Sequence, residues 1–127
     1  MFKTLLVEDN LIYREELKNA LQKKFVNLET KESVGESDTL DIVNTFDPDL
    51  VIMDIDLHSG INGLVLTKKL KDECPEAVVV ILSQHDFPEY RSVAKQNGAD
   101  FFISKSSKLE NIFDYVSSVI DRKHEHH

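Results

Sequence analysis

Five short apolar segments alternate with longer amphipathic segments along the chain. Apolar runs of this length are typical of strands buried on both faces, and regular alternation with helices favours a parallel sheet. We therefore expect an α/β fold, a doubly wound five-stranded parallel sheet with helices on both faces. The predicted strands are 3–7, 28–34, 50–54, 77–82 and 100–104, and the predicted helices are about 10–24, 37–46, 64–73, 88–97 and 107–121.

Capping and turn residues mark the ends of these elements. Asp9 or Asn10 and Ser37 are candidate N-caps, and 107–110 matches a capping box. The proline in 47–49 ends the second helix. The weaker alternation of 28–34 indicates an edge strand. Along the first helix, we expect one apolar face made of Leu11, Leu17, Ala20 and Leu21.

Polar residues stand at the ends of four predicted strands. Glu8 and Asp9 follow the first strand, and Asp54 ends the third. Ser83 follows the fourth strand and Lys105 the fifth. Because the carboxyl ends of parallel strands meet at one edge of the sheet, these side chains are expected to lie together. Three acids, a hydroxyl and an ammonium suit divalent-metal binding and phosphoryl chemistry on an aspartate.

Each of these residues also has a simpler interpretation when taken singly. Glu8 and Asp9 would suit a helix N-terminus, where carboxylates cap N–H groups and oppose the dipole. Lys105 would be a solvated loop lysine, and Ser83 would be a turn residue. Phe102, in the predicted fifth strand, would be an ordinary core residue. The pairing of the first two acids with Asp54 favours the metal site.

Composition narrows the class of protein. A chain of 127 residues with 41% hydrophobic and 30% charged residues suits one soluble domain. The net charge of −8, without a basic stripe, argues against nucleic-acid binding by this domain. The single cysteine, Cys74, excludes an internal disulfide and favours the cytoplasm. No stretch resembles a signal peptide or a membrane span, so we expect a cytoplasmic domain at 1–121 and a linker or tag remnant at 122–127.

Four motifs together resemble the receiver domain of bacterial two-component response regulators. The similar segments are 6–10, 48–57, 80–83 and 98–105, and the resemblance extends from residue 1 to about 121. Each segment is weak evidence alone, whereas all four in this order are specific. The resemblance implies the flavodoxin-like strand order 2-1-3-4-5. It also implies a signalling domain, not an enzyme beyond its own phosphorylation and dephosphorylation.

The resemblance assigns a role to individual residues. Asp54 would accept a phosphoryl group from a sensor histidine kinase or a small phosphodonor. Mg²⁺ or Mn²⁺ would be held by Glu8, Asp9, Asp54 and the backbone carbonyl of Asp56. Ser83 and Lys105 would contact the phosphoryl oxygens, and Ser83 with Phe102 would form the switch. The lifetime of the acyl phosphate would be tuned by Asp56, Gln84 and His85.

A surface and two kinds of partner are implied as well. The face formed by 87–97, 101–104 and 109–121 would change its binding preference on phosphorylation and would support a homodimer. The 106–107 entry to the last helix resembles receivers of the NarL/FixJ type, which precede a helix-turn-helix DNA-binding domain. A stand-alone receiver is the other possibility.

The chain departs from the family pattern at several positions. Ser106 follows Lys105 where proline is usual, and His58 stands where the acceptor loop usually has proline. That loop also looks one residue longer than usual, and Gln84 replaces a small residue. We hypothesise that Asp56 and His85 pair across the mouth of the site and gate the hydrolytic water. In the alternative interpretation, both side chains point into solvent.

Two other functions fit parts of the pattern. Asp54-Ile55-Asp56 also resembles the nucleophile motif of haloacid-dehalogenase-type phosphatases, with Ser83 and Lys105 in later motifs. That family needs an acidic pair beyond the lysine, for which Glu110 and Asp114 are the candidates. A pseudo-receiver that only binds partners is the third reading, disfavoured because the phosphorylation set is complete.

Overall fold

The computed structural model describes residues 1–57 and 60–125. Five parallel strands form one sheet in the order β2-β1-β3-β4-β5, which confirms the predicted fold and strand order. The strands are β1 (Phe2–Val7), β2 (Leu28–Ser33), β3 (Leu50–Met53), β4 (Val78–Ser83) and β5 (Phe101–Ser104). The helices are α1 (Leu11–Lys24), α2 (Glu36–Phe46), α3 (Gly63–Glu73), α4 (Pro88–Gln96) and α5 (Leu109–Glu125).

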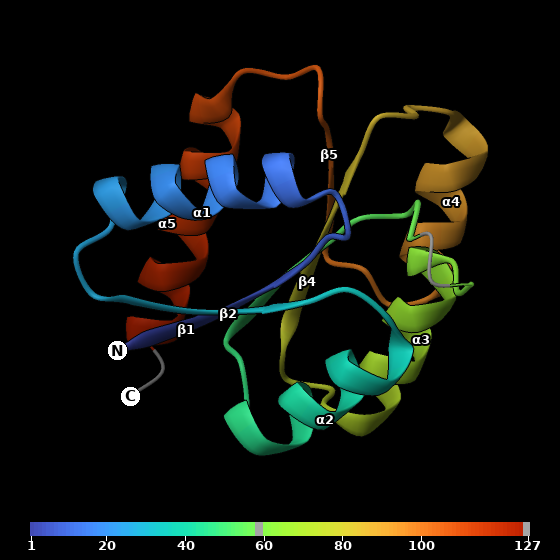
Figure 1. Ribbon diagram of the computed structural model, residues 1–127, viewed down its shortest axis with the longest axis horizontal. Coiled ribbons are helices and arrows are strands. Elements are labelled where there is room, and N and C mark those ends of the chain that lie inside the picture. Colours follow the sequence, from blue (N-terminus) through green and yellow to red (C-terminus); the bar gives the residue numbers. More distant parts are fainter. Residues whose placement is uncertain (58–59, 126–127) are drawn as a thin grey trace.

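Helices cover both faces of the sheet (Figure 1). α1 and α5 lie on one face, while α2, α3 and α4 lie on the other. Alternate side chains of β1 point to opposite faces, so Leu5 and Val7 join the α2–α4 core and Leu6 joins the α1/α5 core. All four residues of the central strand β3 are buried, as expected for a strand covered on both sides. β2, by contrast, alternates buried and exposed residues at the edge of the sheet.

The start of α1 differs from the expected apolar face. Leu17 and Leu21 are buried, but Leu11 is 60% exposed. Leu11 is the first residue of the helix and precedes the part that crosses the sheet, so it faces outward. Asn10 is the N-cap, and its side-chain oxygen accepts a hydrogen bond from the Tyr13 N–H. The predicted apolar face is therefore confirmed at Leu17 and Leu21, but it does not include Leu11 in the first turn.

The predicted cap of α2 was wrong. Ser37 lies inside the helix, and Gly35 occupies the N-cap position. Asp38 supplies the capping carboxylate, because its two oxygens accept hydrogen bonds from the N–H groups of Val34 and Gly35 at 2.8 and 2.9 Å.

The last helix differs from the prediction at both of its ends. α5 begins at Leu109 and continues to Glu125, past the predicted end at 121. The expectations for His58 and for residues 126 and 127 lie outside the described residues. Within the described ranges, no helix has both the length and the apolar character needed to cross a bilayer.

Candidate functional site

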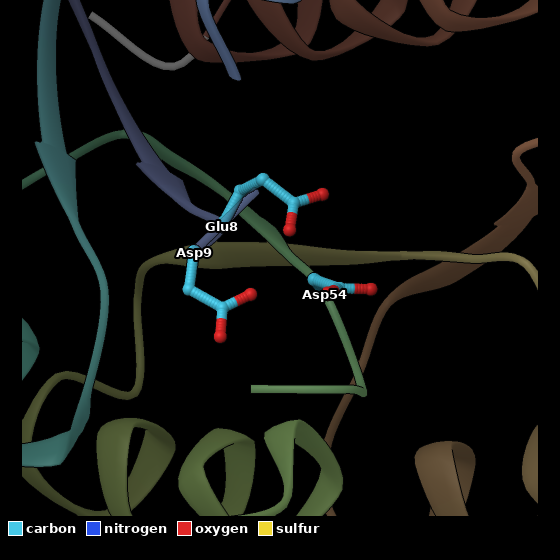
Figure 2. Close-up of side chains that lie close together, drawn as sticks. All are labelled: Glu8, Asp9 and Asp54. Atoms are coloured by element: carbon cyan, nitrogen blue, oxygen red, sulfur yellow. The ribbon is translucent and has the colours of Figure 1, made fainter. Parts of the chain in front are cut away.

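Three carboxyl groups gather at the carboxyl edge of the sheet. Glu8 and Asp9 directly follow β1, and Asp54 directly follows β3 (Figure 2). One oxygen from each of the three lies within 4.8 Å of the others. Glu8 and Asp54 are 5% and 6% exposed, so two of the acids are withdrawn from water. The structure therefore brings together the carboxylates that the sequence analysis expected at this edge, where a hard cation would relieve their repulsion.

Backbone hydrogen bonds between neighbouring strands position these acids. The N–H of Asp54 donates to the carbonyl of Val7 at 3.0 Å, which extends the β1–β3 pairing by one residue. The N–H of Glu8 donates to the carbonyl of Ser33 at 3.1 Å, on the other side of β1. Because both acids are held by ladder-like bonds, their positions follow from the sheet itself and not from a flexible loop.

Lys105 reaches the acids from the far side of the site. Its Nζ lies 2.5 Å from Oε1 of Glu8 and 3.4 Å from Oδ1 of Asp54. The side chain is 9% exposed, so the ion pair is largely shielded from solvent. The N–H of Lys105 donates to the carbonyl of Ser83 at 2.7 Å, which ties the end of β5 to the end of β4. A buried ammonium thus compensates part of the negative charge.

The loop after Lys105 departs from the family pattern, and its own side chains shape it. The Oγ atoms of Ser104 and Ser106 share a hydrogen bond of 2.7 Å, and the N–H of Ser106 donates to Oγ of Ser104 at 3.2 Å. The described residues contain no cis peptide bond, so Lys105 and Ser106 are joined by a trans bond.

Burial dominates the electrostatics of Asp54. Burial, together with the nearby Glu8 carboxylate, raises the pKa of this carboxyl group to about 7, although the ammonium of Lys105 acts in the opposite direction. The single ammonium does not balance two buried acids, so the site retains a demand for positive charge.

An open pocket of about 580 Å³ lies in front of the acids. Asp56, Gln84 and His85 contribute to its wall. Nε2 of His85 lies 3.4 Å from Oδ2 of Asp56, so the two side chains pair in the lining of the pocket. The ring of His85 also stacks on Phe87, with 5.9 Å between the ring centroids.

Ser83 and Phe102 are both buried. Ser83 is fully buried, and its Oγ accepts a hydrogen bond from the N–H of His85 at 3.0 Å. Phe102 is 9% exposed and belongs to the core on the α2–α4 side. The guanidinium of Arg91 lies 4.6 Å from the Phe102 ring centroid and also pairs with Asp86 at 2.5 Å. Neither Ser83 nor Phe102 lines the pocket among the described residues.

Two residues that the sequence analysis did not single out for the site contact it closely. Arg14 donates from a guanidinium nitrogen to the carbonyl of Glu8 at 2.7 Å and pairs with Glu32 at 2.8 Å. The ring centroid of Tyr13 lies 4.3 Å from Nζ of Lys105. Tyr13 precedes Leu17 and Leu21 at intervals of four, so its helical spacing was the available signal.

The acidic pair required by the phosphatase alternative does not reach the site. Glu110 and Asp114 lie on α5, both exposed, and neither lines the pocket in front of Asp54. The described part of the chain therefore lacks the second acidic pair at the place where that mechanism needs it.

The sequence is similar to those of known bacterial regulatory proteins. The glycerol metabolism activator of Pseudomonas putida is 28% identical over 122 residues, which are 95% of this chain and 55% of that protein. The oxygen regulatory protein NreC of Staphylococcus haemolyticus is 35% identical over 72 residues, 57% of this chain and 33% of that protein. The chain thus spans about half or less of the length of these relatives.

A solved structure and a family model also match this chain. A CheY-like response regulator receiver domain from Methanospirillum hungatei JF-1 superposes with a TM-score of 0.90 at 17% identity, covering 100% of this chain and 99% of that one. The family model described as the response regulator receiver domain matches residues 4–117. With its strand order and its carboxyl-edge acids also in place, the chain belongs to the receiver-domain family of two-component response regulators.

Proposed function

We propose that Asp54 accepts a phosphoryl group in a Mg²⁺-dependent reaction, with a sensor histidine kinase or a small phosphodonor as the source. The observation that carries the proposal is the close approach of Glu8, Asp9 and Asp54 beside the ammonium of Lys105. Receiver domains are signalling domains and not classical enzymes, so the reaction modifies the protein itself. Action in the cytoplasm, where such a kinase domain would meet it, is part of this proposal.

The donor set fits a hard divalent cation. Carboxylate and carbonyl oxygens are the ligands that Mg²⁺ prefers, and Mg²⁺ usually needs only a few of them. The cation, Mg²⁺ or Mn²⁺, would be held by Glu8, Asp9, Asp54 and the backbone carbonyl of Asp56. When bound, it supplies positive charge that favours ionised carboxylates and neutralises phosphoryl oxygens. The raised pKa of Asp54 supports this demand for charge.

The chemical step is a direct transfer between nucleophiles. A carboxylate oxygen of Asp54 attacks phosphorus and forms the O–P bond of an acyl phosphate. The P–N bond to the histidine of the kinase breaks, and its electron pair remains on the imidazole. Nζ of Lys105 lies 3.4 Å from Oδ1 of Asp54, and its ammonium would follow the added negative charge.

The switch would start from Ser83 and Phe102. We expect the hydroxyl of Ser83 to leave the N–H of His85 and turn to a phosphoryl oxygen, which changes the β4–α4 loop. Phe102 lies one strand away and would repack under α4. The face formed by α4, β5 and α5 would then favour a homodimer or a different output contact.

The greater length of the relatives supports the presence of an output domain in the parent protein. The chain covers 55% of the Pseudomonas putida activator and 33% of NreC. We infer that this receiver controls a transcription-regulating output domain, a helix-turn-helix DNA-binding domain of the NarL/FixJ type, in a longer parent chain. The receiver itself, with its net charge of −8, would not contact nucleic acid.

Residues at the pocket mouth would set the lifetime of the acyl phosphate. Asp56 and His85 meet at 3.4 Å, and Gln84 lines the same wall. A hydrolytic water must approach phosphorus opposite the Asp54 oxygen, so side chains across the mouth would limit its entry.

Intact-mass measurement after incubation with acetyl phosphate and Mg²⁺ tests the proposal. The expected result is one phosphoryl adduct in the wild type. No adduct should form when EDTA is present or in Asp54→Ala. Asp72→Asn is the matched control, because Asp72 is an exposed acid on α3 and should leave the adduct unchanged. No adduct and no Mg²⁺ binding would instead indicate a pseudo-receiver. Rapid turnover of a generic phosphomonoester would revive the phosphatase alternative.

A further inference from the structure

Tyr13 brings an aromatic ring into contact with the ammonium of the site. Its ring centroid lies 4.3 Å from Nζ of Lys105, within the range of a cation–π interaction. The same ammonium contacts Glu8 at 2.5 Å and Asp54 at 3.4 Å. Its two acidic partners and an aromatic face thus surround an ammonium on a side chain that is only 9% exposed.

The first turn of α1 fixes the tyrosine relative to the acids. The N–H of Tyr13 donates to Oδ1 of Asn10 at 3.0 Å, and the N–H of Asn10 donates to Oε2 of Glu8 at 3.2 Å. Glu8 accepts from Lys105 with its other oxygen. The four residues therefore form one connected group, in which the helix cap, the acid and the ring hold fixed positions around the ammonium.

The Tyr13 side chain contacts the ammonium as a neutral group. Burial, together with the negative charges of Glu8 and Asp54, raises the pKa of the Tyr13 hydroxyl to about 12. The hydroxyl therefore stays protonated, and the ring offers the ammonium its negative face without competing as an anion. A long lysine side chain has many rotamers, and a fixed ring face that replaces water reduces this freedom.

We propose that Tyr13 is a positioning residue for phosphorylation, which holds the Lys105 ammonium against the Asp54 carboxylate through its ring face. The proposal rests on the function proposed above, because Lys105 is assigned to the phosphoryl oxygens there. The ring preorganises the ammonium on the acceptor side before the phosphoryl group arrives, so less reorganisation accompanies the transfer.

Three variants separate the ring from the hydroxyl and from simple packing. Tyr13→Phe keeps the ring face, and Tyr13→Leu keeps an apolar side chain without a ring. Phe46→Leu is the matched control, since Phe46 is a buried ring 5.1 Å from Nζ of Lys31, at a site that does not include Asp54. The rate of phosphorylation by acetyl phosphate with saturating Mg²⁺ is measured by intact mass for each.

We expect Tyr13→Leu to lower the rate constant by about three- to tenfold, the effect of losing a partly buried cation–π contact on the transfer step. Tyr13→Phe should retain the wild-type rate, and so should Phe46→Leu. A wild-type rate in Tyr13→Leu would overturn the proposal while the function of Asp54 stands. Equal losses in the Phe and Leu variants would overturn it too, because the hydroxyl would then be the acting group.

A second readout does not depend on phosphorylation. In metal-free protein the ring current of Tyr13 should shift the ε-methylene resonance of Lys105, which is assigned by its absence in Lys105→Arg. The shift should persist in Tyr13→Phe and disappear in Tyr13→Leu. An unchanged resonance in Tyr13→Leu would contradict the contact itself. If the wild type formed no phosphoryl adduct, the function of Asp54 would fail, and this resonance would still decide whether the contact exists.

Discussion

Gly63 lies directly against the backbone of Asp54. A Cβ atom at Gly63 would come within 1.9 Å of the Asp54 carbonyl oxygen and 2.8 Å of its carbonyl carbon. The N–H of Gly63 also donates to the carbonyl of Ile55 at 2.8 Å. α3 therefore begins in contact with the backbone of Asp54, and only glycine leaves room for this approach.

Gly63→Ala should destabilise the protein more than an ordinary glycine substitution. The new methyl group would collide with backbone, which cannot rotate away, so we expect a loss of about 2–3 kcal/mol in the free energy of unfolding in urea. Gly60→Ala is the control, because Gly60 has open space but a φ of 101°, and it should cost about 1 kcal/mol. Equal costs for the two variants would contradict the close packing at Gly63.

The stability of the metal-free protein should depend on pH through Asp54. Its pKa rises from 3.8 to about 7 on folding, chiefly through burial, so the folded state binds this proton more tightly than the unfolded state. Protonated Asp54 therefore favours the folded state. This contribution to the free energy of unfolding is fully present below about pH 4, is lost as the pH rises towards 7, and changes no further above that range.

Asp54→Asn should remove this dependence, because an amide does not ionise. The difference in unfolding free energy between variant and wild type, measured in EDTA, should widen in favour of the variant from pH 4 to 7. At pH 8 it should reach on the order of 1–2 kcal/mol, less than the pKa shift alone implies because solvent screens part of the charge. Asp72→Asn, at an exposed position, should follow the wild-type profile. Parallel profiles for Asp54→Asn and wild type would disprove the shift.

His85→Ala should shorten the lifetime of the acyl phosphate severalfold. The variant removes the contact of 3.4 Å with Asp56 and the stacking on Phe87, so water gains access to the pocket mouth. Decay of the phosphoryl adduct is followed by intact mass after removal of the phosphodonor. Phe87→Leu is a useful comparison, since it removes the stacking but leaves the Asp56 contact. An unchanged lifetime in His85→Ala would end the gating hypothesis.

Arg91 and Phe102 should be energetically coupled. The guanidinium lies 4.6 Å from the ring centroid, and a double-mutant cycle of Arg91→Ala with Phe102→Leu should give a coupling of about 0.5–1 kcal/mol. Asp86→Ala tests whether the exposed ion pair with Arg91 contributes separately, and it should cost less than about 1 kcal/mol. Additive effects of the Arg91 and Phe102 substitutions would show that the ring and the guanidinium are independent.

The fold and the gathering of acids were predictable because they depend on strong, simple signals. Central strands such as β3 are apolar on both faces, and a parallel sheet necessarily collects its carboxyl ends on one edge. These two facts place Glu8 and Asp54 on the same edge, and the pairing of β1 with β3 then brings them close together. The strand order came from the family resemblance, since periodicity carries no information about neighbours.

Other features depend on contacts that no local pattern records. The N-cap of α2 at Gly35 uses a carboxylate from inside the helix, and Ser37 offered a more conventional local signal. Phe102 faces the α2–α4 core because of its place in the sheet, whereas the alternation along β5 allowed either side. Tyr13 meets Lys105 only after the first helix and the fifth strand have packed.

The ion pair of Glu8 with Lys105 joins residues that are 97 positions apart. During synthesis, the ribosome therefore delivers all three acids of the site well before their ammonium partner. A nascent chain that ends after Asp54 carries concentrated negative charge at the edge of an incomplete sheet. The charge of the site is therefore first compensated when the fifth strand docks, and we expect the proposed phosphorylation to become possible only at that step.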